Sequence, residues 1–596
     1  MDFEYKNNNI QLGFGEDILK NILKSRGIED VDRFLNLDDS VIEDYHNFDN
    51  IYEASTIVMK AVNENKQIQI LVDHDSDGFS SASLMYSYLK DICNKFEKEF
   101  NVGYIIHNKK SHGLDDYVME VLHNLKSNDC CDLLIIPDAS SNDYKQHEEL
   151  SRLGIDIVIL DHHDCDKYSE YATVVNNQLS NKINDKSMCG VGVVYKFCKL
   201  LDERLYSNFA DKYLDLVAYG SIADNCDMRN LQTRWLTLKG LELIQNGENN
   251  NKLLKELFKK QSYSLKKKAT INGFAFYMSP CINCIIRGGD EELWDILFKA
   301  FIGTNDKYKD KIRGKGEVEL SVEEYVLRRY DKLKRQQNKS VDTEVKKLDE
   351  QIEQYGLNKN EILVLNGEKI KDKQYNRIIV NKLSSNYNKH VLLLSKVNNS
   401  KEIYGGSATG RDNKEIDNFR KWCEDTGLFD FAEGHPLAFG VQIKYENINK
   451  LYKLISTIPS SDKLIYTVDH KFEGKVLNDK MIRIIGGFND FWGNKIDEPL
   501  FAIENVKVNS NDVILQGKTK STIKFVYNNI DFIKFKSDEE EYNKITSNEA
   551  NNFTIIGRFS INEYNGETRP QVIITDMKYT KTEPIESNNV NPFKII

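Results

Sequence analysis

The sequence predicts an α/β protein: a doubly wound parallel sheet, a second α/β region joined to it by a long helix, and a C-terminal β-barrel of the OB type. Three observations support this prediction. Short runs of Ile, Leu and Val alternate with helical segments in the first half of the chain. A stretch rich in Glu, Lys, Arg and Gln, without Pro or Gly, follows at residues 318–354. Beyond residue 463, apolar residues show the alternation that is typical of β-strands.

Four apolar runs in the first half predict parallel strands. They lack polar alternation, which is typical of strands that are buried on both faces of a sheet. Helical segments separate them, as expected for crossover connections in a doubly wound domain. The runs are QIQILVD from Gln67, NVGYIIH from Asn101, CDLLIIPD from Cys131 and DIVILDHH from Asp156.

The charged stretch at residues 318–354 predicts a long helical connector. Apolar residues recur in it at helical spacing, as at Val322, Tyr325 and Val326. We expect this helix to be mostly exposed, with a break or kink near Asn338. A helix that packs on the first domain explains the same pattern, so both alternatives stay open.

Two further sets of strands follow the connector. EILVLNG from Glu361 and HVLLLSKV from His390 predict a second α/β region. Alternating runs separated by turn residues then predict a small barrel of the OB type. These runs are LFAIENVKV, DVILQGKT, TIKFVYN, NFTIIGRFSI and PQVIITDMKY.

Composition and charge narrow the class of protein. The chain is 40% hydrophobic and 10% aromatic, which indicates a folded protein. It has no apolar stretch long enough to span a bilayer, and MDFEYKNNNI has no signal-peptide pattern, so we expect a cytoplasmic protein without membrane association. Ten scattered cysteines argue against a disulfide framework. The net charge of -11 does not exclude nucleic acid, because local patches and bound cations set the field at a site.

The segment LVDHDSDGFSS carries the strongest local signal. A strand delivers Asp73, Asp75 and Asp77 at alternating positions, and Gly78 then opens a turn into a helix. Three carboxylates at this spacing repel one another unless cations or hydrogen bonds offset the repulsion. Oxygen ligands suit Mg²⁺ or Mn²⁺. A surface loop of solvated acids is the alternative, and the buried strand that precedes the loop argues against it.

Three more segments place polar groups at similar points. IIPDASS puts Asp138 at the end of a strand, and VILDHHDCD puts Asp161, His162 and His163 directly after another. Imidazole is a common metal ligand and proton donor. YGSIADNCD places Asp224 after a segment of small residues, where an ordinary helix-cap or turn aspartate is the simpler explanation when the segment is taken alone.

Taken together, these segments predict a metal centre. Ligands of open α/β sheets collect at the carboxyl ends of the strands, where three of the four segments lie. Five aspartates and one histidine that converge there could hold two divalent cations. Two metals about 3.5–4 Å apart can activate a bridging water and stabilise the attacking and leaving oxygens of a phosphoester.

In this order, DHDSDG, PDASS, DHH and SIAD resemble the four motifs of the DHH phosphoesterases. The resemblance implies that His163 faces the scissile phosphate as a polariser or general acid and that Asp161 orients a histidine. The first motif more often has the sequence DYDVDG, and the second usually has a glycine after the Asp region, but neither departure removes a ligand. The implied metal ligands are Asp73, Asp75, Asp77, Asp138, His162 and Asp224.

Other segments narrow the resemblance to the RecJ-type single-strand DNA exonucleases. VVNNQLSN and MCGVGVVYKFCKLL resemble the region that follows DHH in that family, and IGRFSINEYNGETRPQVIITDM resembles its OB ending, with Tyr564 in place of a Trp. FYMSPCINCIIRGG resembles the RecJ segment containing PRINAAGR, so Asn283 and Arg287 become candidate phosphate contacts.

The second α/β region carries the two signatures of the DHH-associated domain, GGSATGRD and AEGHPLAFG. Glycine-rich backbone can approach a phosphate closely, and an arginine can bind it with two hydrogen bonds. Glu433 stands where the usual GGH has its first glycine. Ordinary glycine-rich turns explain the same letters without the family. The implied contacts to a terminal phosphate or sugar-phosphate are Ser407, Arg411, Gly434 and His435.

The family implies a metal-dependent exonuclease that hydrolyses single-stranded DNA 5′→3′ to mononucleotides with two Mn²⁺ or Mg²⁺ ions, in DNA repair, recombination or replication. We expect a monomer in a bacterial cytoplasm, or in the host cytoplasm if phage-encoded, with a single-strand-binding protein or helicase as a further partner. The alternatives are an oligoribonuclease or cyclic-dinucleotide phosphodiesterase of the same superfamily, and a non-catalytic replication scaffold. The predicted domains are an N-terminal segment at 1–50, the DHH catalytic domain at 51–315, the helical connector at 316–356, the DHH-associated domain at 357–462 and the OB-fold domain at 463–596.

Overall fold

The computed structural model describes residues 2–5, 15–109, 111–397, 400–411, 416, 418–458, 465–564 and 566–584. The chain divides into two compact units. The first unit contains Met1–Asn283, Asp290–Val326 and Leu464–Ile596, and the second contains Cys284–Gly289 and Leu327–Lys463.

A five-stranded sheet in which every pair is parallel forms the centre of the first unit, as the sequence predicts. Its strand order is β3-β2-β4-β5-β6. All residues of β2 and β4 are buried, which explains why these runs lack polar alternation. The strands are β2 (Ile68–Val72), β3 (Val102–Ile106), β4 (Leu133–Pro137), β5 (Asp156–Asp161) and β6 (Thr173–Asn176).

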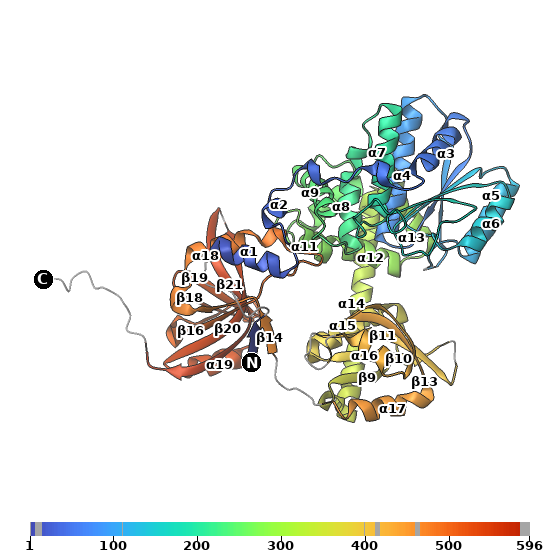
Figure 1. The fold of residues 1–596 in the computed structure, drawn as a ribbon. Coiled ribbons are helices and arrows are strands. Elements are labelled where there is room, and N and C mark those ends of the chain that lie inside the picture. Colours follow the sequence, from blue (N-terminus) through green and yellow to red (C-terminus); the bar gives the residue numbers. More distant parts are fainter. Residues whose placement is uncertain are drawn as a thin grey trace. The chain divides into compact units, whose positions relative to one another are not determined.

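Helices cover both faces of this sheet, so the doubly wound prediction is confirmed. Helices α5 (Asp116–Ser127) and α6 (Tyr144–Arg152) lie on one side, and α3 (Ile51–Asn63), α4 (Ser76–Lys95) and α7 (Gly190–Leu205) lie on the other (Figure 1). The chain leaves β2 toward β3 and then returns to the far side of β2 at β4. The strand order therefore reverses between β2 and β4, and such a reversal opens a crevice at the carboxyl ends of the two strands.

Helices and one hairpin complete this part of the first unit. Helix α8 (Leu214–Ala223) packs against α4, α7 and α9. The other elements are α9 (Leu231–Asn246), α10 (Lys252–Gln261), α11 (Ile271–Gly273), the π-helix η4 (Phe274–Met278), α12 (Ser279–Gly288), α13 (Glu291–Phe301) and the antiparallel strands β7 (Lys307–Ile312) and β8 (Gly316–Ser321).

The predicted connector is one continuous helix, α14 (Val322–Tyr355), so the predicted break near Asn338 is wrong. Its C-terminal half has an exposed face and a buried face. Apolar residues at spacings of four, three and four form a buried stripe, and this stripe packs in one cluster with Leu363 and Leu365 of the second unit. The stripe consists of Val341, Val345, Leu348 and Ile352.

The second unit contains a five-stranded sheet with the order β12-β13-β11-β10-β9. Strand β10 pairs with β9 in parallel, and the other pairs are antiparallel. The elements are β9 (Ile362–Asn366), α15 (Asn376–Tyr387), β10 (His390–Lys396), β11 (Ile403–Thr409), α16 (Phe419–Asp425), β12 (Phe429–His435), β13 (Ala438–Lys444) and α17 (Tyr445–Ile455).

A seven-stranded sheet of order β15-β16-β20-β21-β19-β18-β17 forms the C-terminal region of the first unit. It contains every run that the sequence predicts there, and also β15 (His470–Glu473) and β19 (Ile530–Phe535), which the prediction missed. Its other strands are β16 (Phe501–Asn509), β17 (Ile514–Gln516), β18 (Thr522–Tyr527), β20 (Ala550–Tyr564) and β21 (Glu567–Thr582), with helices α18 (Asp479–Gly487) and α19 (Glu539–Thr546). Trp492 is 1% exposed and therefore belongs to the core.

The N-terminal segment is attached to this C-terminal region. Strand β1 (Asp2–Tyr5) pairs in parallel with β14 (Ile465–Val468), and α1 (Gly15–Ser25) packs on α18. Arg26, just before α2 (Val31–Leu35), donates two hydrogen bonds of 2.6 and 2.9 Å to the Asp469 carboxylate. Both side chains of this ion pair are 5% exposed. Removing either partner would leave an uncompensated buried charge, so the pair helps to fix the N-terminal segment in place.

Short 3₁₀ turns connect several of these elements. They are η1 (Asp39–Val41), η2 (Tyr45–Asn47), η3 (Ala210–Tyr213), η5 (Leu357–Lys359), η6 (Lys373–Tyr375), η7 (Gly474–Val476), η8 (Asn489–Phe491) and η9 (Ser510–Asp512). Within the described ranges, no helix has both the length and the apolar character that a bilayer-spanning segment needs.

Candidate metal centre

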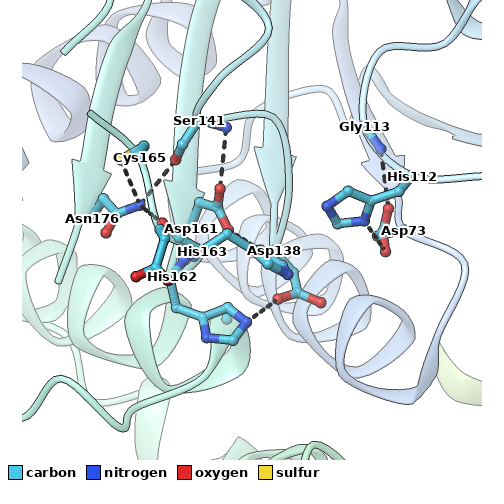
Figure 2. Close-up of polar contacts among 12 residues, drawn as sticks. Asp73, His112, Gly113, Asp138, Ser141, Asp161, His162, His163, Cys165 and Asn176 are labelled. Carbon is cyan, nitrogen blue, oxygen red and sulfur yellow. Dashed lines mark hydrogen bonds and ion pairs between the residues drawn. The ribbon is translucent and has the colours of Figure 1, made fainter. Parts of the chain in front are cut away.

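Two groups of side chains gather at the carboxyl ends of β2, β4 and β5, together with Asp224 from the end of helix α8. The six predicted ligands form two sets of three, and the ligand atoms of each set lie within 4.8 Å of one another. Between the sets, His162 Nε2 lies 3.2 Å from Asp138 Oδ1 (Figure 2). The first set is Asp73, Asp75 and Asp138, and the second is Asp77, His162 and Asp224.

The first motif folds as a strand end followed by a helix cap. Asp75 is the N-cap residue of α4, and its carboxylate accepts a hydrogen bond of 2.9 Å from the backbone N–H of Gly78. Gly78 is required here because a Cβ atom would lie 2.6 Å from the carbonyl oxygen of Asp73. The alternation of the strand and the first helical turn therefore direct the three aspartates of the motif toward the crevice.

The start of helix α7 holds the third aspartate of this motif. Asp77 is 2% exposed, and its carboxylate accepts hydrogen bonds from the backbone N–H groups of Gly190 at 2.7 Å and Val191 at 3.2 Å. Unpaired N–H groups at a helix N-terminus stabilise negative charge. The segment MCGVGVV therefore holds the Asp77 carboxylate in place.

Asp138 occupies a strained and crowded position after β4. Its φ of 65° lies in the left-handed region, which aspartate adopts more readily than most residues. Its backbone N–H donates to the carbonyl of Leu160 at 2.9 Å. The side chain is 1% exposed, and its Oδ1 atom accepts no hydrogen bond of good geometry from the described groups, although His162 Nε2 lies 3.2 Å away. A Cβ atom at Gly190 would lie 2.3 Å from this oxygen, so only glycine leaves room for the carboxylate.

Asp161 accepts hydrogen bonds from the ring and the backbone of His163 and belongs to neither ligand set. One oxygen of Asp161 accepts from His163 Nδ1 at 2.8 Å and from the backbone N–H of His162 at 2.7 Å, and the other accepts from the backbone N–H of Ser141 at 3.1 Å (Figure 2). Burial opposes ionisation of Asp161, but the hydrogen bond and charge of His163 outweigh it, so the pKa of this carboxyl lies well below its usual range.

The two histidines of the DHH segment have opposite electrostatic properties. Burial lowers the pKa of His162, so its imidazole stays neutral, which is the form that binds a metal. Burial also disfavours the charged form of His163, but the hydrogen bond and charge of Asp161 dominate and raise its pKa to about 9. His163 is therefore a cation at neutral pH, and its ring is half-exposed. This arrangement provides one neutral ligand and one charged hydrogen-bond donor side by side.

The carboxylates of the site cannot all be ionised at neutral pH without a compensating charge. Burial, followed by the charges of Asp73 and Asp77, raises the pKa of Asp75 to about 6. Burial and neighbouring carboxylates raise the pKa of Asp138 well above its usual range and that of Asp224 to about 8. Divalent cations would remove this penalty, and the donor set of carboxylate oxygens and one imidazole fits Mn²⁺ or Mg²⁺.

His112 is a neighbour of the site that the sequence analysis missed. Its Nδ1 lies 2.9 Å from Asp73 Oδ2, and the backbone N–H of Gly113 donates to Asp73 Oδ1 at 3.3 Å (Figure 2). The His112 ring also meets the His163 ring edge-on, with 4.8 Å between the ring centroids. The sequence signal that could have found His112 is its position in the loop after the predicted strand NVGYIIH, because polar groups that follow parallel strands share one edge of the sheet.

The residues predicted to contact the substrate are divided between the two compact units. Asn283 belongs to the first unit, and its Oδ1 accepts a hydrogen bond of 3.0 Å from Ser76 Oγ in the first motif. In the second unit, Arg287 is exposed. Burial, followed by the charge of Arg287, lowers the pKa of Arg377. Arg411 donates to the carbonyl of Ser384 at 3.2 Å.

The other predicted contacts lie on the sheet of the second unit. Ser407 is a residue of β11, and Gly434 of β12 has a φ of 130°, which requires glycine. The His435 side chain lies outside the described part of the structure, as does that of Tyr564. The roles of these residues therefore remain predictions.

Known proteins resemble the chain over nearly its full length. The DHH family N-terminal domain matches residues 67–221, and the RecJ OB domain matches residues 468–576. A Bacillus subtilis protein provisionally named SPbeta prophage-derived single-strand DNA-specific exonuclease YorK is 38% identical over 577 residues, which cover 96% of this chain and 97% of that protein. The single-stranded-DNA-specific exonuclease RecJ of B. subtilis is 24% identical over 578 residues, or 94% of this chain and 67% of that protein.

Solved structures agree with the fold. The crystal structure of RecJ from Thermus thermophilus in complex with Mn²⁺ matches with a TM-score of 0.69 at 17% identity, over 96% of this chain and 76% of that chain. The Mg²⁺ complex of the same protein matches with a TM-score of 0.64 at 15% identity, over 95% of this chain and 75% of that one. These matches confirm the predicted fold class.

Proposed function

Because the chain belongs to the RecJ-type single-strand DNA-specific exonucleases of the DHH superfamily, we propose that it hydrolyses single-stranded DNA from the 5′ end and releases mononucleotides. The observation that carries this proposal is the pair of adjoining ligand sets at the reversal point of the sheet. Hydrolysis of a phosphodiester needs stabilisation of charge at phosphorus and an activated water, and a site built from two such sets fits that requirement.

Two divalent cations, Mn²⁺ or Mg²⁺, are the cofactors that the site supports best. One ion would be held by Asp73, Asp75 and Asp138, and the other by Asp77, His162 and Asp224. When bound, such ions lower the pKa of a shared water and neutralise the charge of the phosphate oxygens. The buried Oδ1 atom of Asp138, which accepts no hydrogen bond of good geometry from the described residues, supports this assignment independently of the family.

His163 is the proposed catalytic residue on the protein side. Asp161 accepts the hydrogen bond from its Nδ1, which fixes the ring and keeps it charged. The Nε2–H then faces the scissile phosphate, where it donates a hydrogen bond to a non-bridging oxygen or a proton to the leaving oxygen. Asp161 acts through His163 and is therefore a positioning residue.

Single-stranded DNA is the proposed substrate because the chain carries a RecJ OB domain in addition to the two α/β parts. OB folds bind single strands through basic grooves and aromatic stacking. In the second unit, the proposed contacts to the terminal phosphate are Ser407, Arg411, Gly434 and His435. Asn283 and Arg287 are further proposed phosphate contacts, and Arg287 is exposed and lies close to a second guanidinium.

Degradation of an end-labelled oligonucleotide tests this proposal. Single-stranded and duplex DNA with a label at the 5′ or the 3′ end should be incubated with Mn²⁺ and, separately, with Mg²⁺. We expect a 5′ label to appear at once as mononucleotide, a 3′ label to pass through shortened products, and duplex to persist. Cleavage of dinucleotides or cyclic dinucleotides without cleavage of long single strands would favour the smaller-substrate phosphodiesterases instead. Absence of any metal-dependent cleavage would favour a scaffold.

The cellular context remains a proposal that rests on the family alone. A role in DNA repair, recombination or replication, a partnership with a single-strand-binding protein or helicase, and a monomeric state follow from the resemblance. One relative is prophage-derived by its name, which makes phage DNA replication one of the settings to examine.

A further inference from the structure

Two buried thiols adjoin the second ligand set, and the proposed reaction uses neither. Cys189 is the N-cap residue of α7 and is 0% exposed, and Cys226 follows Asp224 by two residues and is 4% exposed. The two Sγ atoms and a carboxylate oxygen of Asp224 all lie within 4.8 Å of one another. Cys226 Sγ is 3.9 Å from Asp224 Oδ2, and Cys189 Sγ is 3.7 Å from Ser221 Oγ.

This cluster differs from the rest of the metal centre in its chemistry. Thiolate ligands select Zn²⁺ and related soft ions, whereas carboxylates and water suit Mg²⁺ and Mn²⁺. In a tetrahedral zinc site with Zn–S bonds of about 2.3 Å, two sulfurs lie about 3.8 Å apart. The two thiols are therefore close enough to bind one ion after a small shift, with the carboxylate of Asp224 as third ligand and a water as fourth.

The position of Asp224 makes such binding consequential. The same carboxylate belongs to the set with Asp77 and His162. It also lies at the exposed end of the cluster, whereas the two thiols are buried beneath it. An ion held by the thiols would draw Asp224 toward sulfur and away from the other two side chains. The two uses of Asp224 therefore compete.

We propose that Cys189, Cys226 and Asp224 form a binding site for a soft divalent cation such as Zn²⁺ or Cd²⁺, and that its occupation inhibits the enzyme by withdrawing Asp224 from the catalytic set. Each thiol releases its proton to solvent as its sulfur–metal bond forms, so no oxidant or reductant is involved. The binding site stands on its own geometry, whereas the inhibition rests on the proposed exonuclease function.

Cd²⁺ is the probe for the binding step, because a cadmium–thiolate bond has a charge-transfer absorption in the ultraviolet. The full chain, kept reduced, should be titrated as wild type and as Cys189→Ser, Cys226→Ser and the control Cys198→Ser, which replaces another buried cysteine of α7. We expect the absorption to saturate at one equivalent in wild type and in the control, and to be lost in the other two variants. Equal absorption in wild type and Cys226→Ser would overturn the proposal.

A measurement on the unmodified protein removes any dependence on the folding of variants. X-ray absorption of the zinc-loaded wild type should give two sulfur neighbours at about 2.3 Å. A zinc ion surrounded by oxygen and nitrogen alone would contradict the proposed site.

Inhibition is then measured as Mn²⁺-dependent degradation of single-stranded DNA at rising Zn²⁺, with each variant referred to its own rate without Zn²⁺. We expect the inhibitory concentration to rise at least tenfold in Cys226→Ser and to stay as in wild type in Cys198→Ser. An unchanged inhibitory concentration in Cys226→Ser would refute the competition for Asp224. If the wild type binds Cd²⁺ through its thiols but degrades no DNA, the proposed function fails and the soft-metal site stands. If the wild type degrades DNA but shows no cadmium–thiolate absorption, the soft-metal site fails and the proposed function stands.

Discussion

Replacing Asp138 by asparagine separates a metal ligand from a residue that merely supports the fold. Asparagine has the same shape and tolerates the φ of 65° that this position requires, so the backbone should stay in place. The change removes only the negative charge and one acceptor oxygen. If Asp138 binds a cation, activity should fall while the metal-free protein becomes more stable.

The expected magnitudes follow from the crowding of charge. Two unit charges 4.8 Å apart, the limit within the set of Asp73, Asp75 and Asp138, repel by about 3.5 kcal/mol at an effective dielectric constant of about 20. Protonation of Asp138 relieves part of this repulsion in the wild type, so we expect Asp138→Asn to stabilise the metal-free protein by about 1 to 3 kcal/mol. Loss of an ion from the site should reduce turnover at least about 1,000-fold, which corresponds to about 4 kcal/mol of activation free energy.

The assays are thermal unfolding in EDTA and in Mn²⁺, and degradation of end-labelled single-stranded DNA. Mn²⁺ should raise the melting temperature of the wild type more than that of Asp138→Asn, because a bound ligand stabilises only the folded state. Near-normal turnover, or a metal-free variant that is less stable than the wild type, would refute the reasoning.

Gly190→Ala provides a second test that leaves every ligand present. The added Cβ would lie 2.3 Å from Asp138 Oδ1, so the carboxylate must move. We expect weaker Mn²⁺ binding and slower turnover in Gly190→Ala. The matched control is Gly487→Ala, where the Cβ meets nothing within 4 Å, and it should behave as wild type. Equal metal affinity in the two variants would contradict the packing argument.

Three further predictions concern charge. Asp161→Asn removes the negative charge that raises the pKa of His163 to about 9. The alkaline limit of the pH–rate profile should therefore move to lower pH. An unmoved limit would reject His163 as the charged donor. The pKa values of Asp75 and Asp224 are raised to about 6 and about 8. The stability that protonation of these two groups gives the metal-free protein is therefore complete below about pH 4 and is lost as the pH rises through those values. Unfolding measured in EDTA should show this decline, and a free energy of unfolding that rises from pH 5 to 8 would contradict it. Arg287→Ala should weaken single-strand binding several-fold and reduce the dependence of log K on log[salt] by about one unit, and an unchanged salt dependence would remove Arg287 from the phosphate contacts.

The carboxyl ends of the parallel strands could be predicted because strands buried on both faces appear in the sequence as short, continuous apolar runs. Runs of Ile, Leu and Val located β2, β4 and β5, and the acids and histidines that follow them had to meet at one edge of the sheet. Asp224 was harder, because it follows helix α8 rather than a strand. Its local sequence offered no reason to prefer a ligand over a turn residue, and only the resemblance to a family included it.

Other features were missed because long-range packing decides them. His112 lies in an irregular loop whose path depends on Gly113 and Asp73, which no local periodicity reveals. Helix α14 is unbroken because Val341 and its neighbours pack against Leu363 and Leu365 inside the second unit, whereas the charged sequence indicated an exposed helix with a break. Strand β19, with the sequence IDFIKF, is short and follows the turn residues Asn528 and Asn529 directly, so it escaped detection as a separate strand.

The number and coupling of bound Mn²⁺ ions test the central claim most directly. Electron paramagnetic resonance of the full chain, titrated with Mn²⁺, counts bound ions and detects magnetic coupling between ions that share a bridging ligand. We predict two ions per chain with a coupled signal in the wild type, and loss of the coupling in Asp138→Asn. A single uncoupled ion in the wild type, or the same coupled signal in both proteins, would contradict the proposal that these six side chains hold a pair of metals.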